Sequence, residues 1–333
     1  MNLNSPSPAK DADTKGSRIA VIDTARGVAL IAMTIYHFTW DLEFFGWLLP
    51  ATATTTPLLE FARAIAFSFL FLVGISLVLA HQKRNDDGSL IIQIRWRAFW
   101  IRFVQIAAAA AIITTVTWLA FPGGTIFFGI LHAIALFSLV GLLFLRLRWF
   151  VTLCAAIAVF AIGQTFSHDI FTHPAFFWAG LATTPPVSND YVPMFPWMAA
   201  TLLGIALAQL LTQLESWSSL ARFTLPQAVE RPLHFISRHS LVYYLIHQPI
   251  MIGILWCVVA IGFGPDRTST FLHSCNQQCV PSRSAAFCNS YCSCMANGLK
   301  DMKQFTPFMD GEFNISEDQR GQDLILQCIA EAE

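Results

Sequence analysis

The sequence predicts an all-α membrane protein, a polytopic bundle of about seven transmembrane helices followed by a small cysteine-rich tail. Three observations support this fold class. The 333 residues are 55% apolar and only 12% charged, whereas soluble domains carry roughly 25% charged residues. The apolar residues form continuous runs of about 20 residues, the length that crosses a bilayer as a helix. Polar sequence and six of the eight cysteines gather after Gly264.

The apolar runs are continuous and do not alternate with polar residues, which argues against the strands of a membrane barrel. The predicted spans cover residues 19–40, 57–80, 99–121, 125–145, 149–166, 193–213 and 240–263. A cleaved signal peptide is the less favoured interpretation of the first run, because ionisable groups interrupt it and it is too long. The predicted division is a disordered cytoplasmic lead-in at 1–17, a membrane domain at 18–263 and a tail at 264–333.

Lysine and arginine predict the orientation, because cytoplasmic loops are enriched in them. The loops of one side, 41–56, 122–124 and 167–192, contain neither residue. The flanks of the other side contain Lys10, Lys15, Arg18, Lys83, Arg84, Arg95, Arg97, Arg146, Arg148, Arg222, Arg231 and Arg238. We therefore expect a cytoplasmic N-terminus and an extracytoplasmic C-terminal tail.

The tail cysteines indicate disulfides, since an even number in a short polar segment outside the cell is typical of them. They are Cys275, Cys279, Cys288, Cys292, Cys294 and Cys328. The first four follow the pattern C-x3-C-x8-C-x3-C, which allows two helices with cysteines at i and i+4, and a hairpin with two bridges is one arrangement. The pairing stays open. A zinc site is less favoured, because the spacing matches no common zinc finger.

The first span carries Asp23, Arg26, His37 and Asp41, although a charge in mid-bilayer costs on the order of 3 kcal/mol. Asp23 and Arg26 are three residues apart and share a helix face. His37 follows Arg26 by eleven residues on the same face, about 16 Å along the helix. Asp41 follows His37 by one turn and is predicted to orient its imidazole. The plainer interpretation is an ion pair between helices and a solvated Asp41.

Four further polar residues are candidates for substrate binding: Arg63, His132, Asp190 and His247. Each has a structural alternative, for example an ion pair of Arg63 with Glu60 or a solvated Asp190. The sequence contains no phosphate-binding loop, dinucleotide fingerprint, zinc-protease motif or hydrolase elbow. It has no basic stripe for nucleic acid. We expect no metal and no permanently bound cofactor.

Several blocks resemble a known family, in bacterial members: "RIAVIDTARGVALIAM" and "YHFTWDL" in the first span, then "FLFLVGISLVLA", "FGILHAIAL", "PMFPWMAATLLGIALA" and "RHSLVYYLIHQPI". They resemble the heparan-alpha-glucosaminide N-acetyltransferase catalytic domain, a family of polytopic membrane acyltransferases. Asp23 and Arg26 match its Asp-x-x-Arg-Gly motif, and His37, His132 and His247 match polar positions of the blocks. The chain has no histidine between His37 and His81, so the acetyl-histidine route proposed for the animal enzymes does not carry over.

The resemblance implies transfer of an acyl group, in particular acetyl, from cytosolic acyl-CoA to an extracytoplasmic acceptor in the bacterial inner membrane. We expect a glycan amine or hydroxyl as acceptor, His37 as general base, Arg26 at the acyl donor, and His132 and His247 along the tunnel. The competing interpretations are a solute or proton-coupled transporter and a non-catalytic membrane scaffold. Membrane lipid is the expected surrounding, and the oligomeric state is left open, a homo-oligomer included.

Overall fold

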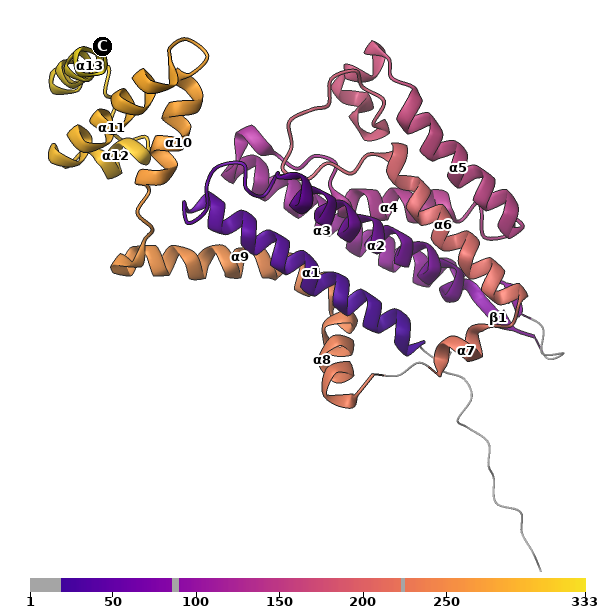
Figure 1. Cartoon of the computed structure of the whole chain (residues 1–333). Coiled ribbons are helices and arrows are strands. Elements are labelled where there is room, and N and C mark those ends of the chain that lie inside the picture. Colours follow the sequence, from indigo (N-terminus) through magenta and orange to yellow (C-terminus); the bar gives the residue numbers. More distant parts are fainter. Residues whose placement is uncertain (1–18, 86–89, 223–224) are drawn as a thin grey trace, which may run out of the picture. The chain divides into compact units, whose positions relative to one another are not determined.

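The structure is a computed structural model that describes residues 19–85, 90–222 and 225–333. The predicted lead-in at 1–17 lies outside these residues. The described chain is predominantly helical (Figure 1), as the sequence predicts. Among the described residues its strands are a short antiparallel pair, β1 (Gln82–Arg84) and β2 (Leu90–Ile92), in which Lys83 faces Ile91.

The chain forms two compact units. The first comprises residues up to 31 together with 64–245, and the second comprises 32–63 together with 246–333. Three helices contribute residues to both units: α1 (Ala20–Phe44), α2 (Thr56–His81) and α9 (Ser240–Val258). This division follows packing, whereas the predicted boundary at residue 264 follows composition and stays a prediction.

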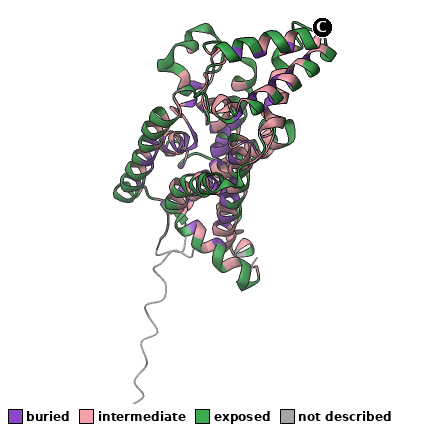
Figure 2. Ribbon diagram, turned by 90° about the vertical axis from the view of Figure 1, so that its left-hand side faces the viewer, coloured by how far each residue is buried: buried purple, intermediate pink, exposed green. Residues whose placement is uncertain are grey.

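The first unit is a layered helical bundle in which α5 packs along α6, and α4 contacts both α3 and α6 (Figure 1). Leu70, Val78, Phe137 and Ile205 are fully buried at its centre. Figure 2 shows that burial concentrates where helices face one another, while outward faces are exposed. Its elements besides the shared helices are α3 (Trp96–Ala120), η1 (Pro122–Gly124), α4 (Ile130–Gly141), α5 (Trp149–Thr165), η2 (Asp169–Thr172), η3 (Pro174–Ala179), α6 (Met194–Gln213), α7 (Trp217–Ala221) and α8 (Gln227–Arg238).

Two glycines set the closest helix approach in this unit. A side chain at Gly74 of α2 would collide with the carbonyl oxygen of Thr201, and one at Gly204 of α6 would collide with that of Phe71. Small residues at an interface let helix backbones approach closely, which is the usual way that helices associate in lipid. The two glycines therefore bring α2 and α6 into backbone contact.

Within residues 19–85, 90–222 and 225–333, four helices are long and apolar enough to cross a membrane. They are α2, α3, α6 and the segment Ser240–Phe263, which continues α9 through the π-helical turn η4 (Val259–Phe263). The seven predicted spans are not confirmed. The predicted spans at 125–145 and 149–166 contain helices of only 12 and 17 residues, α4 and α5. The first span forms the 25-residue helix α1, but its polar residues keep it outside the group of four.

Exposed side chains support lipid as the surrounding of these helices. Trp118 and Leu119 of α3 are 64% and 71% exposed, and Trp256 and Phe263 of the last span are 63% and 72% exposed. A soluble protein rarely presents large apolar side chains in such density. The structure thus agrees with an integral membrane protein.

The tail in the second unit folds into α10 (Thr268–Cys279), α11 (Ala285–Asp301), α12 (Phe305–Met309) and α13 (Gln319–Ala332). The predicted disulfides are confirmed, and all six tail cysteines are paired. The bonds are Cys275–Cys292, Cys279–Cys288 and Cys294–Cys328. The first two staple the hairpin of α10 and α11, and the third joins α11 to α13. Because the six cysteines are paired with one another, the structure favours disulfides over the zinc alternative.

Two tail helices, α11 and α13, have N-cap side chains that bond the backbone of the first turn. The hydroxyl of Ser284 accepts a hydrogen bond from the backbone N–H of Phe287 at the start of α11. The carboxylate of Asp318 accepts one from Gly321 at the start of α13. Such caps satisfy backbone donors that the first helical turn leaves unpaired. Phe271, Leu299 and Leu324 form a small apolar core beside the disulfides.

Candidate functional site

The predicted pair of Asp23 and Arg26 is present on α1 and belongs to a larger group, the Arg26 cluster, which we define as Asp23, Arg26, Ser76 and Ser237. The Arg26 guanidinium lies 3.1 Å from the Asp23 carboxylate. It also donates to the Ser76 hydroxyl on α2 at 2.7 Å. The Ser237 hydroxyl on α8 donates to Asp23 and accepts from Arg26, at 3.3 and 3.4 Å.

Gly27 lets α8 reach this part of α1. A side chain at Gly27 would meet the backbone carbonyl oxygen of Leu233 on α8. The Arg-Gly step of the motif therefore has two functions, since the arginine makes the polar contacts and the glycine leaves room for the helix that carries Ser237. Ser237 is 2% exposed, whereas the side chains of Arg26 and Asp23 are 20% and 24% exposed, so the cluster is partly buried.

In the second unit, the structure joins His37 of α1 to His247 of α9. The two ring nitrogens, His37 Nδ1 and His247 Nε2, are 2.8 Å apart, and the rings stack with centroids 5.0 Å apart. A hydrogen bond between two ring nitrogens needs one N–H and one lone pair. The two rings of this His37–His247 pair therefore cannot both be doubly protonated imidazolium ions while the contact persists.

Asp41 lies in the same unit. The sequence predicts that it orients His37, but its hydrogen bond in the structure goes to another residue. Its carboxylate accepts from the side-chain amide of Gln248, the residue after His247. Asp41 is fully buried, and its second carboxylate oxygen has no hydrogen-bond partner among the described residues; the amide oxygen of Gln248 also has none. Buried polar atoms without partners are costly and uncommon in folded proteins. Asp41 and Gln248, which lie close in sequence to His37 and His247, thus each have one buried oxygen atom that could accept a hydrogen bond.

His132 and Asp190 serve the start of α4 in the first unit. His132 Nδ1 accepts from the backbone N–H of Gly129 at 3.3 Å, and its Nε2 lies 3.2 Å from the Thr114 hydroxyl. Since Thr114 donates its own hydrogen to the carbonyl oxygen of Ile126, His132 Nε2 is the donor. Both nitrogens of His132 are therefore used, which makes it a structural histidine here.

The Asp190 carboxylate accepts from the backbone N–H of Ile130 at 2.8 Å and so caps α4. Burial raises the pKa of the Asp190 carboxyl to about 6, although this hydrogen bond lowers it. Gly129 leaves space for the carboxylate, because a side chain there would collide with it. The predicted solvation of Asp190 as the plain alternative is wrong, since the group is drawn into the fold.

Arg63 forms an ion pair with Glu60 at 2.6 Å. This is the structural alternative that the sequence analysis named for Arg63. Both side chains are more than half exposed, and exposed pairs of this kind contribute about 0–1 kcal/mol. This ion pair does not include any residue of the Arg26 cluster or of the His37–His247 pair. Among the described residues, no group of three or more His, Cys, Asp or Glu side chains lies together in a way that could hold a metal.

Three partners were not found from the sequence: Ser76, Ser237 and Gln248. Their side chains carry no charge and do not titrate, so the search for ionisable groups in the spans did not mark them. Their neighbours offered a weak signal, because Gln248 follows His247 and Ser76 lies in the apolar block "FLFLVGISLVLA".

Apolar helices of spanning length place the chain in the class of polytopic integral membrane proteins. The chain belongs to the family of the heparan-alpha-glucosaminide N-acetyltransferase catalytic domain, whose family model matches residues 18–249. The match contains both the Arg26 cluster and the His37–His247 pair, and it ends before the disulfide-bonded tail. No curated protein matches the chain. No solved structure matches it either.

Proposed function

We propose that the protein is an integral membrane acyltransferase that moves an acyl group, in particular acetyl, from cytosolic acyl-CoA to an extracytoplasmic acceptor. Membership of the family supports acetyltransferase-like chemistry. The proposed acceptor is an amine or hydroxyl of a cell-envelope glycan. The proposed setting is the bacterial inner membrane, with the N-terminus in the cytoplasm. The disulfides of the tail support an oxidising compartment for the C-terminus.

The observation that carries the proposal is the 2.8 Å contact between His37 and His247. If His37 Nδ1 donates to His247 Nε2, the lone pair of His37 Nε2 is available for a proton. No described residue makes a hydrogen bond with that nitrogen. His247 then holds the His37 ring in one tautomer, which is the role of the orienting partner of a general base.

The proposed reaction balances with these groups. The acceptor amine or hydroxyl attacks the thioester carbonyl carbon, and His37 Nε2 takes the proton that the nucleophile loses. The carbon–sulfur bond breaks, and the departing CoA thiolate receives that proton from His37. His37 keeps its Nδ1–H bond to His247 throughout. A general base of this kind contributes about 10²- to 10⁴-fold to the rate.

The test is acyl transfer by the purified protein in liposomes, with labelled acetyl-CoA and glucosamine as the first acceptor. We expect thioester consumption and a labelled acetyl product with the wild type. His37→Gln should lose most turnover at unchanged folding. His273→Gln, in the tail outside the family match, is the matched control. Normal transfer by H37Q would overturn the role of His37, and solute counter-flow without transfer would support the transporter.

A further inference from the structure

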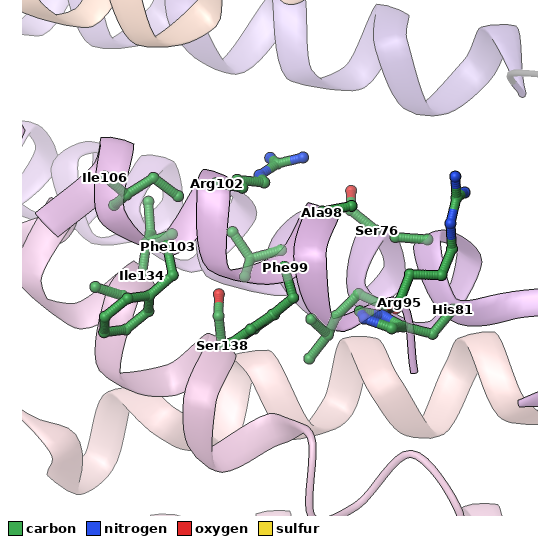
Figure 3. A pocket seen from close by; sticks show the side chains of 14 residues that line it. Ser76, His81, Arg95, Ala98, Phe99, Arg102, Phe103, Ile106, Ile134 and Ser138 are labelled. Carbon is green, nitrogen blue, oxygen red and sulfur yellow. Dashed lines mark hydrogen bonds between the residues drawn. The ribbon is translucent and has the colours of Figure 1, made fainter. Parts of the chain in front are cut away.

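A cavity of about 210 Å³ lies in the first unit, lined by α2, α3 and α4 (Figure 3). Neither the Arg26 cluster nor the His37–His247 pair accounts for it. Its apolar lining includes Leu77, Phe99, Phe103 and Ile134. The polar residues of its wall are Ser76, His81, Arg95, Arg102 and Ser138.

The cavity wall carries two arginines from α3. Arg95 precedes the first turn of α3 and Arg102 follows it by seven residues, about two helical turns on one face. Figure 3 shows both guanidinium groups extending from α3 on the same side. No described carboxylate lies within ion-pair distance of either one. Both side chains are exposed. Two guanidinium groups beside one cavity, without a carboxylate partner among the described residues, favour an anion with several oxygens.

His81 on the same wall has a buried nitrogen without a partner. The side chain is 3% exposed, and its Nδ1 lies 2.8 Å from the carbonyl oxygen of Leu77. A carbonyl only accepts, so Nδ1 carries the hydrogen. The opposite nitrogen, Nε2, is buried and has no hydrogen-bond partner among the described residues. A buried imidazole nitrogen in a cavity wall calls for a ligand or water to complete it.

The cavity is connected to the Arg26 cluster through one residue. Ser76 lines the cavity and also receives the hydrogen bond from Arg26 at 2.7 Å. Ser76 therefore belongs both to the cavity lining and to the Arg26 cluster. Arg95 also lies on the side that the arginine distribution predicts to be cytoplasmic.

We propose that this cavity binds the phosphate groups of an anionic ligand, with Arg95 and Arg102 as the ion-pairing residues and His81 as a further hydrogen-bonding group. Resting on the proposed function, the ligand is the acyl-CoA donor, whose diphosphate would occupy the cavity. Small-molecule sites usually measure about 300–1,000 Å³, so 210 Å³ suits the phosphate part and not the whole donor. The apolar wall residues would face the less polar arm of the ligand.

The test measures binding of CoA, and separately of pantetheine, which lacks the phosphates, to the full chain in detergent. Arg95→Gln and Arg102→Gln should each weaken CoA binding about tenfold or more, the scale of one charged phosphate contact. Pantetheine binding should not change. Arg97→Gln is the matched control, because Arg97 lies in the first turn of α3 and is exposed like Arg95 and Arg102, but it does not line the cavity. Arg102→Lys should recover part of the affinity if charge is what matters.

A lipid headgroup offers the same phosphate chemistry, so a second arm compares thermal stability in bilayers of phosphatidylglycerol and phosphatidylcholine. If R95Q and R102Q abolish a stabilisation by phosphatidylglycerol but leave CoA binding unchanged, the donor assignment is overturned and the ligand is a lipid. If both variants match R97Q in every arm, the site itself is overturned.

Failure of this inference is distinguishable from failure of the proposed function. CoA binding is also measured in H37Q, where catalysis is expected to be lost and the cavity is unchanged. If the protein transfers acetyl but CoA binding does not depend on Arg95 or Arg102, the proposed function is supported and the cavity is rejected as the CoA site. If CoA binding depends on Arg95 and Arg102 but no acetyl is transferred, the cavity is supported as the CoA site and the proposed function is rejected.

Discussion

The Arg26 cluster and the His37–His247 pair are built from the same helix, α1, yet they differ in how their polar groups are satisfied. In the cluster, Asp23 and Arg26 neutralise each other; Ser76 bonds Arg26, and Ser237 bonds both charged groups. Around the histidines, Asp41 and Gln248 keep buried oxygen atoms without partners among the described residues. A satisfied ion pair is suited to hold and bind, whereas a group with unused capacity is suited to move a proton. We therefore expect the first region to bind substrate and the second to transfer a proton.

The largest expected effect is on turnover after changes in the His37–His247 pair. His37→Gln should lower kcat about 10²- to 10⁴-fold, because it removes the proposed general base. His247→Gln should also lower kcat, since it removes the group that orients His37. Steady-state transfer from acetyl-CoA measures both, with KM for the donor nearly unchanged.

The double variant H37Q/H247Q sharpens this prediction. Residues that act as one unit are strongly non-additive, so the double variant should be about as slow as H37Q alone. A loss equal to the product of the two single losses would show that the histidines act independently.

A smaller effect is expected from the Arg26 cluster, and on a different quantity. Arg26→Gln removes a charged hydrogen-bond donor and should weaken CoA binding about tenfold, the size of one such contact. It also leaves the carboxylate of Asp23 without its cation, so thermal stability should fall. Equilibrium binding and thermal unfolding measure the two effects separately.

Asp23→Asn in the R26Q background separates binding from stability. The neutral pair no longer contains an uncompensated charge, so stability should recover while CoA binding stays weak. Recovery of both would mean that Arg26 only balances Asp23. A loss of kcat as large as that of H37Q would erase the difference between the two regions.

The tail provides a reference region outside the family match. The Cys294–Cys328 bond closes a loop with a sequence separation of 34, and such a loop corresponds to about 4 kcal/mol of stabilisation. Replacing both cysteines by serine should therefore unfold the tail at lower temperature, as limited proteolysis would detect. Transfer activity should stay within about twofold, as for changes remote from a site. A loss like that of H37Q would place the tail in the catalytic machinery.

The smallest expected effect concerns Asp190, which belongs to neither polar region. Its pKa is raised to about 6 in the folded protein, compared with about 3.9 in an unfolded chain. The folded state therefore binds more protons between about pH 4 and 6, so stability should fall as pH rises through that window. Asp190→Asn keeps an oxygen for the N–H of Ile130 and should remove this slope.

Thermal unfolding between pH 4 and 7 checks the Asp190 prediction. Asp169→Asn, at an exposed aspartate in the same loop, should keep the wild-type slope. An unchanged slope in D190N would assign the pH dependence to other groups.

Local spacing predicted several features well. The separation of three residues placed Asp23 beside Arg26, because the helix itself brings i and i+3 together. The i and i+4 cysteines of α10 and α11 face each other for the same reason. The expected bond from His37 to Asp41 had equally good spacing, but the structure satisfies each group with a residue of α9. Correct spacing makes a contact available and does not select it.

The sequence by itself determined the helical membrane class, the Asp23–Arg26 pair and the oxidised cysteine-rich tail, because composition and helix periodicity act over a few turns of chain. Only the tertiary structure decided that His37 meets His247 across 210 positions, that Ser237 joins Asp23 across 214, and that Cys294 bonds Cys328. It also showed that four helices in the described part of the chain have the length and apolarity of a membrane span, where the sequence predicted seven spans. Contacts over such separations depend on how helices pack, and close approaches such as those at Gly27, Gly74 and Gly204 set that packing.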